Sequence, residues 1–333
     1  MKIFIDESGR FIPGDGWSIV CALSLPHQFS GPAQRELARL TKDWAKIDGE
    51  LKGALVSVDQ LASLVDCLYR FDAIVHCCAC DVSRHENSAI AEHQAEQAVG
   101  ITRYLVDTHH PEMIAKVWSL RRVVERMPAQ LYIQSVLMRE LVCVVSEETS
   151  HYFAQRKPKE LGKYEWFIDA KDPTGETSQE RGWKDVLGPL IESRSRRKPF
   201  GLVDAPEFNY FFLERSYAFT KEMWFPDKPR QTINGFDLKK MFTDATSFVD
   251  SKSNILVQGV DVLARYLRLA LRAQTIDEAV LRHTGRLQIQ RKRGRIQQSM
   301  NLMSVGRTAL DTKAPELARR MRVMTANARS IWK

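Results

Sequence analysis

The first residues of the chain, Met1–Gly9, place two carboxylates at the end of an apolar strand. The run up to Ile5 has the composition of a short buried strand, and Ser8-Gly9 predicts a turn directly behind it. Asp6 and Glu7 stand at that junction. An uncompensated buried charge is very costly, so such acids are expected to be paired or to hold a metal ion. The pattern raises the question of which other carboxylates converge on Asp6, and which cation holds them together.

The size and composition of the chain are those of a protein with a sizeable core. It has 333 residues, of which 44% are apolar, and this length suits one large domain with insertions or two domains. No apolar run approaches the ~18 residues of a membrane span. The N-terminus enters a strand directly, without a basic leader. These features predict a cytoplasmic protein with no membrane contact.

The six cysteines predict free thiols in a reducing compartment. Three of them lie in the apolar run 73–80, which predicts a strand. Alternation along that strand puts Cys78 and Cys80 on one face and Cys77 on the other. No second C-x-x-C completes a zinc site, so core positions are favoured over metal ligands.

Periodicity along the chain predicts an α/β protein. Strands are expected at 17–25, 73–80, 163–169 and 245–251, and helices at 33–47, 58–71 and 254–267. From about 82 to 160 the spacing is helical, with Tyr104 and Leu105 among the expected core positions. Residues 172–243 give irregular or weak signals.

Three aspartates far apart in the sequence occupy comparable positions. Asp6 and Asp169 each end a predicted strand, whereas Asp261 lies inside an otherwise apolar helix. A mid-helix Asp has poor helix propensity and loses solvation when it faces a core. Gln258, three residues earlier, shares the helical face of Asp261. Gathered carboxylates suit two Mg²⁺ or Mn²⁺ ions, which can clamp the attacking and leaving oxygens of a phosphodiester.

Several short motifs together resemble a known family. They are Ile5-Asp6-Glu7-Ser8-Gly9, Glu50-x-Lys52, Asp250-Ser251 and Gln258-x-x-Asp261. In this order and separation they resemble the bacterial family catalogued as domain of unknown function 3800, which is grouped with the ribonuclease-H-like superfamily. The resemblance covers about 1–82, 163–172 and 245–268.

The resemblance implies a fold and a site. The fold would be a ribonuclease-H-like mixed sheet of about five strands flanked by helices, within a core of residues 1–268 that includes a helical insertion at about 82–160. A divalent-metal site of Asp6, Asp169 and Asp261 is implied, with Glu50 as a further ligand. It also hints at a role in bacterial defence or mobile elements.

Each candidate site residue also has a structural explanation. Asp6 can cap the turn with Ser8, and Asp169 can cap a helix or turn. Glu50 and Lys52 fit the E-x-K half of a PD-(D/E)xK nuclease site, in which Lys steadies the attacking water, but they fit an exposed salt-bridged turn equally well. The sequence leaves these alternatives open.

Other chemistries lack their motifs. No Walker-type G-x-x-x-x-G-K-[S/T], nucleophile elbow, dinucleotide fingerprint or H-E-x-x-H occurs. The usual NTPases, lipase-like hydrolases, nicotinamide enzymes and zinc proteases are therefore disfavoured. The eight histidines are expected at surface or cap positions.

Positive charge is concentrated late in the chain. The net charge is +8, yet 262–333 contains 16 Lys and Arg against 4 Asp and Glu. We therefore expect a basic helical extension at 269–333 that binds a polyanion. Its strongest basic positions are Arg282, Arg286, Arg291, Lys292, Arg293 and Arg295. Contacts from these residues to a phosphate backbone would be sequence-independent and salt-sensitive.

These features predict a nuclease that uses Mg²⁺ or Mn²⁺ to hydrolyse phosphodiester bonds. In this hypothesis Glu50 is a ligand or general base, Lys52 contacts phosphate and Gln258 orients a ligand. The alternative is a nucleic-acid-binding or assembly subunit that keeps the fold without turnover. A homo-oligomer or a protein partner would assemble through the helical insertion.

Overall fold

The computed structural model describes residues 1–170, 239–272, 276–293, 296–306 and 315–332, together with 172, 175, 177, 180, 185–191 and 194. For 239–240 and 291–298 the backbone alone is described. Within these residues the main sheet has six strands. In spatial order they are β5 (Thr246–Val249), β4 (Glu165–Asp169), β1 (Lys2–Ser8), β2 (Trp17–Leu25), β3 (Ile74–Asp81) and β8 (Asn301–Met303).

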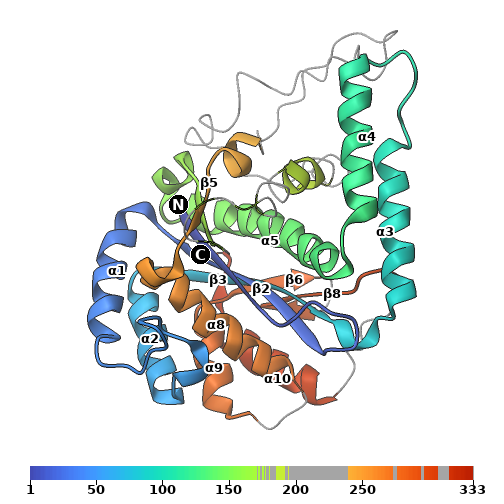
Figure 1. The fold of residues 1–333 in the computed structure, drawn as a ribbon. Helices are drawn as coiled ribbons and strands as arrows, with labels where there is room; N and C mark the ends of the chain where they lie inside the picture. Colours follow the sequence, from blue (N-terminus) through green and yellow to red (C-terminus); the bar gives the residue numbers. More distant parts are fainter. Residues whose placement is uncertain are drawn as a thin grey trace.

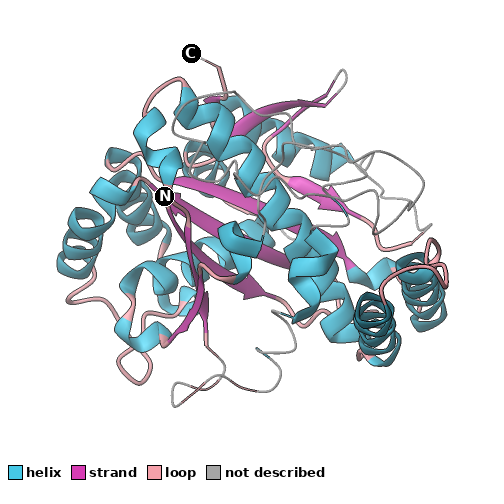
Figure 2. Cartoon of the chain, turned by 90° about the horizontal axis from the view of Figure 1, so that it is seen from above, coloured by secondary structure: helices cyan, strands magenta, loops and turns pink. Residues whose placement is uncertain are grey.

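The sheet is mixed. Strands β1, β2 and β3 form an antiparallel meander, β4 and β5 extend it parallel to β1, and β8 runs parallel to β3. Helices cover both faces of the sheet (Figures 1 and 2). The protein is therefore of the expected α/β class, with a mixed sheet flanked by helices.

The helices divide between the two faces. One face packs against α5 (Ala129–Ala154), and the other is crossed by α8 (Ile255–Leu271), which contacts β1 and β2. Other helices in the described part of the chain are α1 (His27–Leu40), α2 (Val58–Arg70), α3 (Asn87–Thr102), α4 (Pro111–Arg126), α9 (Glu278–Arg286) and α10 (Pro315–Asn327), and residues 185–191 are also helical. Short 3-10 turns are η1 (Gly53–Leu55), η2 (Val82–Arg84), η3 (Pro158–Gly162) and η6 (Ser251–Ser253), and Lys239–Thr243 form a π-helical turn.

Strand alternation decides which face each acid of β1 meets. Ile5 belongs to the apolar cluster on the α5 side, whereas Phe4 belongs to the cluster on the α8 side. Asp6 continues the face of Phe4, and Glu7 continues that of Ile5. Gln134 of α5 accordingly donates a hydrogen bond to Glu7 at 2.5 Å. The first strand therefore directs Asp6 toward α8.

The cysteines lie where the alternation of β3 predicts. Cys78 and Cys80 pack in the cluster on the α5 side, and Cys77 packs in the cluster on the α8 side. All six cysteines are buried. They are core residues in this fold.

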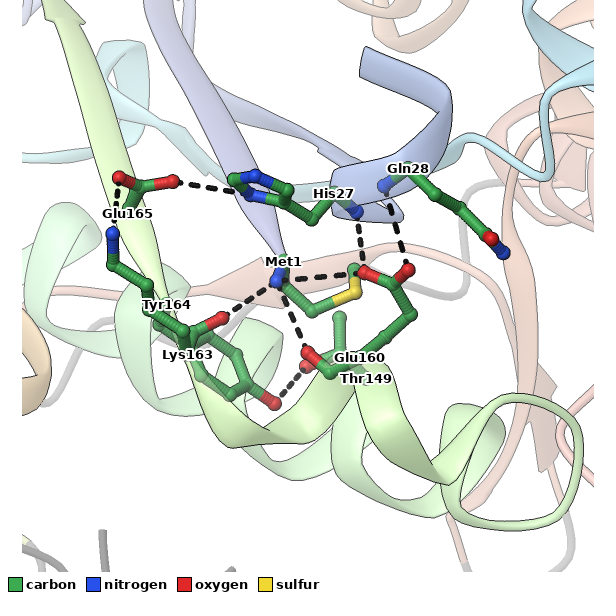
Figure 3. A network of polar contacts seen from close by, with 8 residues as sticks. All are labelled: Met1, His27, Gln28, Thr149, Glu160, Lys163, Tyr164 and Glu165. Carbon is green, nitrogen blue, oxygen red and sulfur yellow. Dashed lines mark hydrogen bonds and ion pairs between the residues drawn. The ribbon is translucent and has the colours of Figure 1, made fainter. Parts of the chain in front are cut away.

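The start of β1 is fastened to the segment that leads into β4 (Figure 3). The amino group of Met1 donates to the carbonyl oxygens of Glu160 (3.0 Å) and Lys163 (2.6 Å). The carboxylate of Glu160 also accepts hydrogen bonds from the first backbone N–H groups of α1, at His27 and Gln28. Glu165 lies between His27 (3.3 Å) and Lys163 (2.9 Å). These contacts hold β1 and β4 in register at the end opposite their acids.

The segment expected to be a basic helical extension is only partly helical. It contains α9 and α10, but also β8 in the main sheet and a second, three-stranded sheet. The strands of that sheet are β7 (Ile296–Gln298), β6 (Ile289–Arg293) and β9 (Arg329–Ser330). The expectation of a helical tail was wrong because strands of two to five residues carry too little periodicity to detect.

The segment between β3 and β4 contains the helices α3, α4 and α5. In Figure 1, α3 and α4 lie side by side at the edge of the molecule, while α5 covers the sheet. Tyr104 was expected in the core, but it is 72% exposed in the connection between α3 and α4. Among the described residues no helix is both long and apolar enough to cross a membrane.

Candidate carboxylate site

The parallel pairing of β1 with β4 brings two of the predicted aspartates together. Ile5 is in register with Ile168, so the next residues, Asp6 and Asp169, lie on neighbouring strands at the same edge of the sheet. Asp169 is the last residue of β4, whereas β1 continues for two residues beyond Asp6. β5 pairs with β4 on its other side and ends at Val249, one residue before Asp250. Three chain segments therefore deliver a carboxylate to this edge.

Helix α8 supplies the third aspartate and is tied to the loop that carries Glu50 and Lys52. The side-chain oxygen of Gln258 accepts from the backbone N–H of Leu51 at 2.9 Å. Its amide nitrogen donates to the carbonyl oxygens of Ser251 (2.7 Å) and Lys252 (3.3 Å). Gln258 is only 3% exposed. It therefore joins the loop before η1 to the turn that follows β5.

Asp261 makes the second connection between α8 and this loop. Its Oδ2 accepts a hydrogen bond from the backbone N–H of Gly53 at 2.8 Å. A Cβ at position 53 would lie 2.9 Å from Cδ of Arg265 and 3.1 Å from Cα of Val262. Only glycine allows so close an approach without a shift. The contact explains how residues 50–53 reach a helix some 200 residues later in the chain.

Glu50 and Lys52 form an ion pair within this loop. The Lys52 Nζ lies 2.8 Å from Oε1 of Glu50. Glu50 is 7% exposed, whereas the Lys52 side chain is 40% exposed. The sequence allowed an exposed salt-bridged turn at Glu50 and Lys52. The salt bridge is present, but only Lys52 is partly exposed, and Glu50 is buried close enough to Asp261 to affect its pKa.

The electrostatics show that these groups share one environment. Burial raises the pKa of Asp6 well above its usual range, and the negative charges of Asp261, Asp169 and Glu7 raise it further. The backbone N–H of Glu7, which donates to Asp6 at 2.7 Å, acts in the opposite direction. Asp6 therefore lies close enough to both other aspartates to feel their charge.

Asp261 and Lys52 act on each other, and Glu50 acts on both. Burial raises the pKa of Asp261 and the charge of Glu50 adds to it, while the N–H of Gly53 and the charges of Lys52 and Arg265 oppose it. Partial burial lowers the pKa of Lys52, but its hydrogen bond to Glu50 and the charges of Glu50, Asp261 and Asp169 outweigh that effect and raise it. All four predicted acids therefore act on one another or on Lys52.

The carboxylate oxygens at this site are the type of ligand that a hard divalent cation binds. The side chains are not arranged around a common point as they would be in a formed metal site. Carboxylate oxygens are what Mg²⁺ and Mn²⁺ take, and a cation would relieve the repulsion that raises the pKa of Asp6. In the part of the chain that the structure describes, however, no group of three His, Cys, Asp or Glu side chains is assembled to hold an ion. Asp261 is engaged by Gly53 and Glu50 by Lys52. Binding would require rotation of these side chains.

Two of the basic positions predicted to contact nucleic acid, Arg282 and Arg286, are not brought to this site. Arg282 pairs with Glu278 at 3.7 Å, and Arg286 pairs with Asp66 of α2 and lies over the ring of Tyr69. α9 ends at the start of β3, where Leu287 accepts from Val75. That is the end of the sheet opposite Asp6 and Asp169. The side chains of Arg291, Lys292 and Arg293 and the whole of Arg295 lie outside the described residues.

Two residues of the site were not foreseen. Gly53 lies close to α8, and the side chain of Arg265 packs against Gly53. The signal for Arg265 was available, because it lies four residues after Asp261 on the same helical face. The signal for Gly53 was not, because a glycine after Lys52 predicts only a turn.

No family model matches the chain, and no curated protein or solved structure matches it. The resemblance to the family of unknown function stays a prediction, and the function is argued from the site alone.

Proposed function

We propose that the protein hydrolyses phosphodiester bonds of nucleic acid with the help of Mg²⁺ or Mn²⁺. The observation that carries the proposal is the convergence of Asp6, Asp169 and Asp261, whose negative charges contribute to the raised pKa of Asp6. They lie on two strands and a helix that are distant in sequence and adjacent at one edge of the sheet. Buried acids that repel one another weaken a fold unless a cation or a proton relieves them.

The residues of the chain would divide the work as follows. Asp6, Asp169 and Asp261 would hold the metal, with Glu50 as a further ligand or as the base that takes a proton from water. Lys52 is partly exposed and would contact the scissile phosphate. Gln258 would keep the loop of Glu50 and Lys52 against α8. When bound, the metal would supply an acidified water and neutralise charge on the phosphorane oxygens.

The sheet supports the finer interpretation of the fold. An antiparallel meander extended on one side by two parallel strands agrees with a ribonuclease-H-like core, to which β8 adds one strand. Membership of the family of unknown function, and the role in bacterial defence that it hints at, remain part of this proposal.

Cleavage assays test the proposal directly. We expect the purified protein to cut single-stranded DNA, RNA or a hybrid in Mn²⁺ or Mg²⁺ and to be silent in EDTA. Asp6→Asn and Asp261→Asn should each reduce cleavage at least about 100-fold. Removing one group that stabilises transition-state charge typically has an effect of that size. Asp107→Asn, on an exposed loop, is the matched control and should cut normally. Equal activity of all three variants would refute the assignment.

The alternative is a subunit that binds nucleic acid without turnover. The lack of three ready ligands among the described acids favours it. Titration calorimetry separates the two, because a nuclease should bind Mn²⁺ and lose that binding in Asp6→Asn. Silence toward Mn²⁺, with nucleic-acid binding retained, would favour the inactive subunit. Assembly through 82–160 stays a prediction.

A further inference from the structure

One side of α8 carries a row of arginines that begins at the carboxylate site. From residue 261 to 272 every residue is buried except Asp261, Leu269 and three arginines. These arginines follow Asp261 at steps of four, three and four residues, which keeps them on one helical face. Arg10, in the loop after β1, faces the same side. We call these four residues the arginine row: Arg10, Arg265, Arg268 and Arg272.

The middle of the arginine row is fixed in place. Nε of Arg268 donates to the carbonyl oxygen of Trp17 at 2.6 Å, at the start of β2. Asp15 lies 4.0 Å from Arg268 and 3.6 Å from Arg10, so it links the helix to the loop. This arrangement is built by the fold and is not a chance cluster of flexible side chains.

The arginine row carries four positive charges, two of which share Asp15. Burial lowers the pKa of Arg268, and the charges of the other three arginines lower it further, while Asp15 opposes them. Among the described residues, no carboxylate oxygen lies within the 4.0 Å ion-pair distance of Arg265 or Arg272. Arg10 is 75% exposed. A surface with this excess attracts an anion.

The dimensions suit a chain of phosphates. Seven residues separate Arg265 from Arg272, which is about 10 Å along a helix, and phosphates of one strand recur roughly every 3.4 Å along a duplex. Two or three successive phosphates can therefore be met. Guanidinium groups bind phosphate oxygens in pairs. The first arginine of α8 lies one helical turn from Asp261, whereas Arg286 lies at the other end of the sheet.

We propose that the arginine row binds the phosphate backbone of the nucleic-acid substrate and leads it to the carboxylates. The inference rests on the proposed function, since it assigns the substrate path of the same site. It moves the principal contact surface from the C-terminal segment to α8 and the loop after β1.

The test measures binding of a fluorescent 20-nucleotide strand and of its duplex by anisotropy, in EDTA so that nothing is cut. In the double variant Arg265→Gln/Arg272→Gln we expect the salt slope for the duplex to fall by about 1.8 and affinity at 0.15 M salt to fall about 30-fold. Arg265→Lys/Arg272→Lys keeps the charge and should retain most of the affinity. Arg268 is left intact because it supports β2.

The matched control is Arg122→Gln/Arg126→Gln on α4, where both residues are exposed. It removes the same charge far from α8 and should bind within about 2-fold of wild type. An equal loss in the control would show an effect of net charge alone and overturn the proposal. Unchanged binding by the α8 variant would also overturn the proposal, provided that an unchanged melting temperature shows the variant to be folded like the wild type. Displacement by poly-glutamate as effective as by unlabelled duplex would identify an acidic-protein surface and also overturn it.

Failure of this inference can be told from failure of the proposed function. Metal-dependent cleavage together with unchanged binding by the α8 variant would contradict only the role of the arginine row. Weaker binding by the α8 variant, with no cleavage in any metal, would contradict only the nuclease activity. Absence of nucleic-acid binding by the wild type would contradict both.

Discussion

Gly53→Ala tests whether the close approach of the 50–53 loop to α8 holds the site together. The added methyl would lie 2.9 Å from Cδ and 3.1 Å from Cβ of Arg265, and 3.1 Å from Cα of Val262. The arginine side chain can move, but the helix backbone cannot move without cost. Overpacking of this kind costs about 1–3 kcal/mol. Displacement of the loop also weakens the 2.8 Å bond to Asp261, and a hydrogen bond to a charged group contributes roughly 1.5–3 kcal/mol.

We therefore expect the free energy of unfolding to fall by about 2–4 kcal/mol, taking partial relaxation into account. Urea denaturation followed by circular dichroism measures it, and cleavage in Mn²⁺ should fall with it. Gly100→Ala is the matched control, since Gly100 lies within α3 with no atom within 4 Å of the new methyl. It should stabilise the protein by up to about 1 kcal/mol. If both variants behave alike, the contact with α8 is not what fixes the loop.

Three further predictions address charge and connection. Since the pKa of Asp6 is raised, the folded state holds its proton more tightly than the unfolded chain, so metal-free stability should decline as pH rises above about 4. Asp6→Asn should make that decline shallower in urea titrations, with the part due to Asp261 remaining. Burial lowers the pKa of the Met1 amino group from 8.0 to about 6, so stability should rise between those pH values by at most roughly 3 kcal/mol. The rise should persist in Asp6→Asn, and its absence would contradict the burial of the amine. Gln258→Leu leaves the N–H of Leu51 unpaired and should cost about 1–3 kcal/mol. Gln258→Glu keeps that acceptor, but its carboxylate cannot donate to the carbonyl oxygens of Ser251 and Lys252, so it should cost at least as much.

The sequence predicted the strands and helices of the core because their periodicity is strong. The strand 17–25 is exact, and the helix expected at 58–71 is observed at Val58–Arg70. The helix expected at 33–47 begins earlier, at His27, and ends at Leu40. Its first turn is capped by the carboxylate of Glu160, which is distant in the sequence. A boundary set by so remote a contact leaves no local signal.

The acids of the site were predictable for a different reason. Asp6 and Asp169 each interrupt an apolar run, and Asp261 interrupts an apolar helix, so each stands out against its neighbours. The basic surface was not predictable in the same way, because counting charge cannot tell which arginines share a face with the acids. Arg286 and Arg265 both belong to the basic segment 262–333. Arg286, however, lies beside Asp66 and Tyr69. Deleting the C-terminal segment would also remove β8 from the main sheet, so point variants are the appropriate test of its charges.

The position of Lys52 explains how the fold tolerates its acids without a metal. Its ammonium group is paired with Glu50 and attracted by Asp261 and Asp169. It is also partly exposed, so it can leave toward solvent at little cost, whereas a buried ammonium could not. Under the proposed function the four acids would hold a divalent cation that neutralises them, and Lys52 would then be free of its pairing with Glu50. Because the ammonium is partly exposed and only two residues from Glu50, a phosphate oxygen of the substrate would be its natural partner.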